Sequence, residues 1–83
     1  MNRAQILKEL KDILRQIEGH DDNVIDAATE ETPLRTQLGL NSIGMLYIMI
    51  VIEEKFSVSF ENATMDSFKR LGDVVDFIEK ESL

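Results

Sequence analysis

The sequence predicts an all-α fold: a small four-helix bundle of three longer helices and one short third helix, with a long loop between the first and second helices. Near both ends of the chain, apolar residues recur at steps of three and four, which is the period of an amphipathic helix. The strongly apolar segment between them, residues 43–56, has no partner strand of matching period elsewhere in the chain. The chain has 83 residues, which favours a single domain over residues 1–83 with one hydrophobic core.

The first helix is predicted over residues 3–18, with charged residues on its outer face. Asn2 suits the N-cap position, with Gln5 three residues later. Gly19 stands where a glycine commonly ends a helix in a left-handed turn. The predicted inward positions of this helix are Ile6, Leu7, Leu10, Ile13, Leu14 and Ile17.

Residues 20–40 predict a long loop, because the helical period is lost among acidic residues and threonines. So long a connection in a small domain is usually functional or contains a short helix, and Thr32 followed by Pro33 indicates where such a helix would begin. The acidic stretch from Asp21 is interpreted as a solvated loop rather than a calcium site. Asp26 occupies its sixth position, where a calcium loop needs glycine.

The segment 43–56 is ambiguous by composition, because the β-branched residues within 48–52 are also typical of a buried strand. Its length and its charged last turn favour a helix. After it, the sequence predicts an extended connection over 57–60 and a short third helix over 61–68. Met65 and Phe68 are expected to point inward there, and the inward positions of the fourth helix are Leu71, Val74, Val75 and Ile78.

The chain is acidic: sixteen acidic and nine basic side chains give a formal net charge of -7. Such a surface repels nucleic acid and anionic membranes. It indicates either that the protein has basic protein partners or that the acidic surface only keeps a small protein soluble. The absence of cysteine excludes disulfides and thiolate metal sites, and any thiol chemistry has to come from a cofactor. The longest apolar run, residues 45–52, is too short to span a membrane. We therefore expect a monomeric, soluble, cytoplasmic protein that binds no nucleic acid.

Ser42 is the candidate functional residue, because it stands where the loop meets the apolar helix. A hydroxyl at such a junction is accessible to a large enzyme, and the free N–H groups and partial positive charge of a helix N-terminus suit a phosphate ester on that oxygen. The serine also fits a purely structural role as a helix cap. A serine-hydrolase role is disfavoured, because Leu40 replaces the first glycine of a nucleophile elbow and His20 has no clear acidic partner. No metal-binding spacing is present.

The stretch LGLNSIGML over residues 38–46 resembles the signature of the acyl carrier protein family, which includes peptidyl and aminoacyl carriers. The order of the predicted helices and the Glu-Glu-Lys-Phe end of the second helix extend the resemblance over almost the whole chain. The resemblance implies that Ser42 receives 4'-phosphopantetheine from coenzyme A, and that the thiol of this arm holds an acyl or aminoacyl group as a thioester. It implies a carrier rather than an enzyme. The implied partners are a phosphopantetheinyl transferase, an acyl- or aminoacyl-loading ligase or acyltransferase, and acyl-using enzymes of fatty acid, polyketide or nonribosomal peptide synthesis.

The resemblance also implies two faces for the helix 43–56. For Leu46 and Ile50, simple burial is the alternative to a place on the partner face. The side facing the core carries Ile48, Val51, Ile52 and Phe56. The side offered to partners carries Ile43, Leu46, Tyr47 and Ile50, with Glu53 and Glu54 at its far end.

Three residues depart from the family pattern. Asn41 stands where members nearly always have aspartate, so one negative charge beside Ser42 is missing, although asparagine still caps a helix. Gly44 and Tyr47 stand where carriers of fatty acid synthesis commonly present acids. Gly44 and Tyr47 leave the early part of the helix uncharged and apolar, which points to a specialised carrier whose partners recognise an apolar surface. Asn41 instead bears on docking to basic transferase surfaces, and hence on how efficiently ordinary phosphopantetheinyl transferases modify Ser42. The alternative from another class is an unmodified acidic helical module that docks a basic protein partner.

Overall fold

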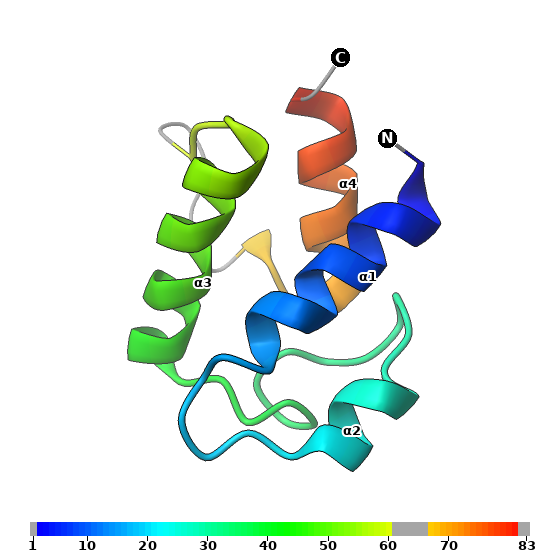
Figure 1. The fold of residues 1–83 in the computed structure, drawn as a ribbon, viewed down its shortest axis with the longest axis vertical. Coiled ribbons are helices and arrows are strands. Elements are labelled where there is room, and N and C mark those ends of the chain that lie inside the picture. Colours follow the sequence, from blue (N-terminus) through cyan, green and yellow to red (C-terminus); the bar gives the residue numbers. More distant parts are fainter. Residues whose placement is uncertain (1, 61–66, 82–83) are drawn as a thin grey trace.

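The computed structural model describes residues 2–60 and 67–81, and within these ranges it is all-helical (Figure 1). Its helices are α1 (Arg3–Leu14), α2 (Asp22–Ala27), α3 (Ser42–Phe56) and α4 (Leu71–Glu81). The described residues form no strand, and their β pairing is limited to an isolated bridge between Pro33 and Arg70. The predicted fold class, a small all-α bundle with three longer helices, is confirmed.

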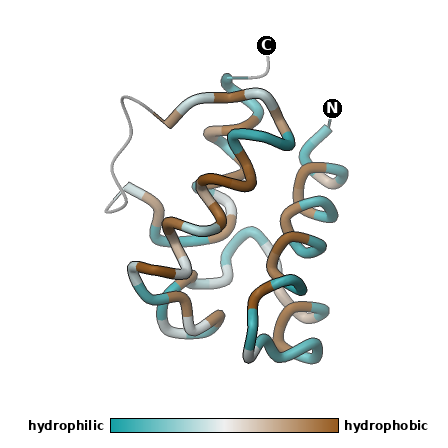
Figure 2. The backbone as a smooth tube through the Cα atoms, turned by 60° about the vertical axis from the view of Figure 1, so that its left-hand side comes forward, coloured by the Kyte–Doolittle hydropathy of each residue, from teal (hydrophilic) through white to brown (hydrophobic). Residues whose placement is uncertain are grey.

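The three longer helices enclose the core. α1 packs against α4 and α3, and it also contacts α2. Figure 2 shows why α1 folds this way: from the N label onward, its tube alternates between apolar and polar residues turn by turn, so one side is buried. The residues whose side chains are fully buried in the core are Ile6, Ile13, Leu34, Met45, Ile52, Leu71, Val75 and Ile78.

α1 begins as predicted and ends earlier than predicted. The side chain of Asn2 accepts a hydrogen bond from the Gln5 N–H at 2.8 Å, which confirms the N-cap. The helix ends at Leu14 rather than at residue 18. Beyond it, tighter i to i−3 hydrogen bonds replace the α-helical pattern, as is common in the last turn of a helix. Gly19 has the predicted positive φ, of 81°.

The short helix of the loop lies elsewhere than predicted. α2 begins after Asp21, whose side chain accepts hydrogen bonds from the N–H groups of Asn23 and Val24, so this acid caps a helix where a solvated loop was expected. The expectation of a helix start at Thr32-Pro33 is wrong. Thr32 is buried and its carbonyl accepts from the Leu71 N–H at 2.9 Å, which ties the segment to the start of α4 instead.

The segment 43–56 is a helix, so the strand alternative is excluded. It ends at Phe56, because Ser57 adopts a left-handed conformation with φ of 55°. The predicted third helix over 61–68 lies outside the described residues except at its end, where Phe68 is buried as predicted. α4 starts at Leu71 and carries its predicted inward positions as buried side chains. None of the described helices combines the length and the apolar character needed to cross a membrane.

Candidate functional site

Ser42 is exposed as the first residue of α3. The side chain of Asn41 accepts a hydrogen bond from the Gly44 N–H at 2.8 Å and is the N-cap of this helix. The prediction that asparagine caps here is confirmed, and the alternative role of Ser42 as the cap is excluded. The Ser42 hydroxyl is therefore not used to begin the helix.

The loop before Ser42 is fixed by two buried leucines. Leu34 is fully buried and its N–H donates to the Lys69 carbonyl at 2.9 Å, while the Leu40 N–H donates to the Leu34 carbonyl at 3.1 Å. Gly39 lies between them with φ of 69°, a conformation that glycine adopts at no steric cost. This turn buries Leu40 and leaves the next two residues exposed, so Ser42 is held at a defined point on the surface.

The first turn of α3 is electropositive. The Met45 N–H donates to the Asn41 carbonyl at 2.9 Å, and the Gly44 N–H is capped. The N–H groups of Ser42 and Ile43 lie at the tip, where a helix offers no internal acceptor. The first turn contains no acidic residue. These features fit a phosphate ester on the Ser42 oxygen, because the amides and the helix dipole favour a negative charge there.

A hydrolytic role for Ser42 gains no support from His20. Its Nδ1 lies 2.8 Å from the Ile17 carbonyl oxygen, and its Nε2 lies 3.0 Å from a carboxylate oxygen of Asp22. The structure thus supplies the acidic partner that the sequence did not reveal. Both ring nitrogens are engaged away from Ser42, so the imidazole is not placed to take the hydroxyl proton.

α3 presents an apolar surface next to Ser42. The exposed fractions are 78% for Ile43, 53% for Leu46, 40% for Tyr47 and 49% for Ile50. These positions follow the spacing i, i+3, i+4 and i+7, so they lie along one side of the helix. Burial of Leu46 and Ile50, which the sequence left open, is excluded. We call these four residues the apolar face of α3.

The opposite side of α3 meets the core. Ile48 and Ile52 are buried and Val51 and Phe56 are half-buried, as the assignment of this side predicted. Met45 is fully buried, although it is not among the core positions predicted from the sequence. Its spacing of three and seven residues from Ile48 and Ile52 was the available signal.

The two acids at the far end of α3 differ from each other. Glu54 is exposed. Glu53 is half-buried, and its Oε2 accepts a hydrogen bond from the Phe60 N–H at 2.9 Å. Its carboxylate therefore helps to position the chain at Phe60, after the end of α3. This role was not predicted from the sequence.

The chain is similar to known proteins over most of its length. The family model described as "Phosphopantetheine attachment site" matches residues 8–78. The chain is 29% identical over 79 residues to the acyl carrier protein of Thermotoga maritima, covering 95% of this chain and 94% of the relative. It is 32% identical over 79 residues to the acyl carrier protein of Coprothermobacter proteolyticus, covering 95% and 93%. A match to the acyl carrier protein of Phytoplasma australiense is 42% identical over 52 residues, covering 63% and 68%.

Proposed function

The chain belongs to the acyl carrier protein family, and we therefore propose that Ser42 is the residue to which 4'-phosphopantetheine is attached. The protein is a carrier that holds acyl groups on this covalently bound group, and it is not itself an enzyme. One observation carries the assignment to Ser42: its hydroxyl is exposed on the first residue of α3, while Asn41 provides the cap. We propose that residues 1–83 form one carrier domain.

Ser42 and the residues around it have distinct roles in this proposal. The Ser42 oxygen loses its proton and attacks the phosphorus that carries pantetheine in coenzyme A; the phosphoanhydride bond breaks, adenosine 3',5'-bisphosphate leaves, and a phosphodiester remains on Ser42. The amides at the tip of α3 stabilise the negative charge of that phosphate. The bound arm supplies a terminal thiol that holds an acyl group as a thioester. Because the chain contains no cysteine, no thiolate of its own competes for that acyl group.

We propose that the apolar face of α3 is the surface that partner enzymes contact, with Glu54 at its far end. Aliphatic and aromatic side chains are typical of interface centres, and Tyr47 combines a large apolar ring with a polar tip. The uncharged start of α3 favours partners with an apolar docking surface over strongly basic ones. This supports a specialised biosynthetic pathway, of the fatty acid, polyketide or nonribosomal peptide type, with its own loading ligase or acyltransferase.

The experiment that tests Ser42 is the intact mass of the protein after incubation with coenzyme A and a broad-specificity phosphopantetheinyl transferase. We expect the wild type to gain the mass of one phosphopantetheine and Ser42→Ala to gain nothing. Ser57→Gly is the matched control, since it removes another exposed hydroxyl at a position whose positive φ suits glycine. It is expected to be modified like the wild type.

A gain of mass in Ser42→Ala would overturn the assignment. If the wild type gains nothing, the same incubation with Asn41→Asp separates two explanations. Restored modification means that the missing charge beside Ser42 hinders common transferases and that the carrier needs a dedicated one. Continued absence of modification favours the acidic interaction module, for which Ser42→Ala retains full partner binding.

A further inference from the structure

The charge beside Ser42 is opposite in sign to the net charge of the chain. The chain as a whole carries a formal charge of -7, yet residues 32–52 contain no acid, and Arg35 is the only charged residue among them. Lys69 and Arg70, just before α4, add two further cations. All three cations are exposed. We call Arg35, Lys69 and Arg70 the basic patch.

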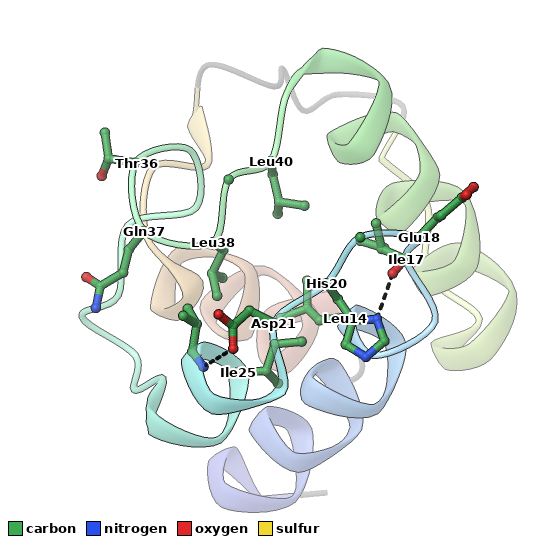
Figure 3. A pocket seen from close by; sticks show the side chains of 13 residues that line it. Leu14, Ile17, Glu18, His20, Asp21, Ile25, Thr36, Gln37, Leu38 and Leu40 are labelled. Atoms are coloured by element: carbon green, nitrogen blue, oxygen red, sulfur yellow. Dashed lines mark hydrogen bonds between the residues drawn. The ribbon is translucent and has the colours of Figure 1, made fainter.

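Backbone contacts bring the two parts of the basic patch together. The Leu34 N–H donates to the Lys69 carbonyl at 2.9 Å, and Pro33 forms the isolated bridge with Arg70. In the view into the pocket between α1, α2 and the loop (Figure 3), the loop runs beside the pale orange segment that leads into α4. Since Arg35 directly follows Leu34, its backbone lies next to the segment that carries the other two cations.

The basic patch is also close to Ser42. The Leu34 carbonyl, which shares a peptide group with the Arg35 nitrogen, accepts a hydrogen bond from the Leu40 N–H at 3.1 Å. The Cα atoms of residues 40 and 42 are separated by at most about 7 Å of extended chain. An enzyme that reaches the Ser42 hydroxyl therefore meets the loop before this serine as well as the apolar face of α3 after it.

The chain itself neutralises the three cations to different extents. Arg70 lies 2.7 Å from Glu31 and 3.7 Å from Asp73, measured between side-chain nitrogen and oxygen atoms. Arg35 and Lys69 form no ion pair with the acids that the structure describes. Their positive charges are therefore available to carboxylates of another molecule.

We propose that the basic patch pairs with an acidic patch on the enzyme that acts on the group at Ser42. The proposal rests on the attachment at Ser42 and adds the kind of partner, whose docking surface is apolar where it meets α3 and acidic where it meets the loop. Charges of this kind steer the encounter and suppress wrong partners. The net charge alone indicates basic partners, and the local charge beside Ser42 reverses that expectation at the docking site.

An acidic protein surface fits the basic patch better than other anions do. The three side chains are exposed and come from two segments, whereas a site for a small anion is concave and places its polar groups precisely. Nucleic acid and anionic membranes are repelled by the acids of the rest of the chain. Carboxylates spread over a protein surface can reach each cation separately.

The first experiment titrates the protein with the acidic peptide hexaglutamate at low ionic strength, and NMR follows the backbone amides. We expect shifts at residues 34–36 and 68–70 that disappear in about 1 M salt, which screens exposed charges. The double variant Arg35→Gln/Lys69→Gln is expected to bind the peptide several-fold more weakly. Lys8→Gln/Lys80→Gln removes two exposed cations elsewhere, with the same change in net charge, and is expected to bind like the wild type.

Three results of this titration would overturn the proposal. The first is equal binding of hexaglutamate by both double variants. The second is binding of hexalysine rather than hexaglutamate at residues 34–36. The third is an equal set of shifts with inorganic phosphate at the same concentration of charge, which would reduce the basic patch to a site for an adventitious ion only.

The second experiment asks whether the basic patch belongs to docking at Ser42. The rate of modification by coenzyme A and a broad-specificity phosphopantetheinyl transferase is measured by intact mass, with and without hexaglutamate. We expect the peptide to slow modification of the wild type several-fold and to have little effect on Arg35→Gln/Lys69→Gln. Equal slowing of both would show that the peptide acts on the transferase, and would overturn the proposal. Absence of modification without the peptide would instead overturn the attachment at Ser42, while the titration still decides whether the basic patch binds acidic surfaces.

Discussion

At the scale of single residues, the neighbours Asn41 and Ser42 at the start of α3 have different roles. Asn41 provides the N-cap through its side-chain oxygen, and Ser42 is left with an exposed hydroxyl. The N-cap side chain folds over the first turn, where it accepts a hydrogen bond from a backbone N–H. The side chain of the first helical residue points outward. Asparagine serves the cap as well as aspartate does but lacks its charge.

Asn41→Ala is predicted to lower the free energy of unfolding by about 1 kcal/mol, the usual cost of losing a cap. Asn41→Asp is predicted to keep the stability, because its carboxylate accepts the same N–H and favours the positive end of the helix. Urea denaturation followed by circular dichroism measures both. Asn23→Ala, an exposed position inside α2 that caps nothing, is the control. Equal losses in Asn41→Ala and Asn23→Ala would contradict the assigned cap.

Asp73 is a second residue whose local contacts set a measurable property. Its carboxylate accepts hydrogen bonds at 3.0 Å from the N–H groups of Arg70 and Lys69 at the start of α4. The Arg70 bond is the largest cause of a pKa below the ordinary aspartate value. The charged form therefore stabilises the folded state above the ordinary carboxyl pKa of about 4, and this contribution is lost as the pH falls through the lower pKa of the folded state.

Asp73→Ala is predicted to lower the free energy of unfolding by about 1 kcal/mol at pH 7. The difference between the variant and the wild type is predicted to shrink as the pH falls below about 4, since the wild-type carboxylate becomes protonated. Denaturation curves at a series of pH values test this. A difference that grows on acidification would show that Asp73 acts in another way.

At the scale of elements, α3 is apolar on both sides. One side is buried because Met45, Ile48 and Ile52 pack against the rest of the bundle, and the other is the apolar face that remains in solvent. A helix that only supported the core would carry polar residues on its outer side. The apolar face therefore exposes side chains that the proposed contact with partner enzymes would bury.

Truncation is predicted to cost much more stability on the buried side of α3 than on its exposed side. Met45→Ala is predicted to lower the free energy of unfolding by about 2 to 4 kcal/mol, because it leaves a cavity in the core. Leu46→Ala, one residue away, is predicted to change it by less than about 0.5 kcal/mol, because half of its side chain is already in solvent. Chemical denaturation compares the two directly. A large loss for Leu46→Ala would place this residue in the core and remove it from the apolar face.

At the scale of the whole molecule, charged groups join segments that are distant in the sequence. Arg3 at the start of α1 contacts Glu30 of the loop, and its Nη1 lies 2.7 Å from Asp76 and 3.1 Å from Glu79 of α4. Lys55 at the end of α3 lies 2.8 Å from Glu9 of α1. In a chain of net charge -7, each such cation also relieves repulsion among the acids that surround it.

Arg3→Gln is predicted to lower the free energy of unfolding at low ionic strength, because three carboxylates lose a shared partner at a partly exposed site. In about 1 M salt the loss is predicted to become smaller, since salt screens both the attraction and the repulsion. Denaturation at two salt concentrations measures this. Lys8→Gln, at an exposed position of the same helix, is the control for the change in net charge. A loss that is independent of salt would indicate packing by the Arg3 side chain instead.

The sequence alone predicts the helical class, the start of α1, the helix over residues 43–56 and the place of Ser42 at its beginning. These features rest on local causes that the chain carries with it: the period of apolar residues, the capping side chains and the conformational freedom of Gly19 and Gly39.

The path of the loop and the surroundings of the site depend on contacts between segments that periodicity does not connect. The buried Thr32 accepts a hydrogen bond from the N–H of Leu71, far along the chain, and the Gly72 N–H donates to the Glu30 carbonyl at 2.7 Å. A Cβ at Gly72 would lie 2.8 Å from that oxygen, so the loop and α4 approach as closely as only glycine allows. A pocket lined by Leu14, Ile25 and Leu40 likewise exists because α1, α2 and the loop converge. The period of apolar residues describes one element at a time, so it does not predict a pocket that forms between several elements.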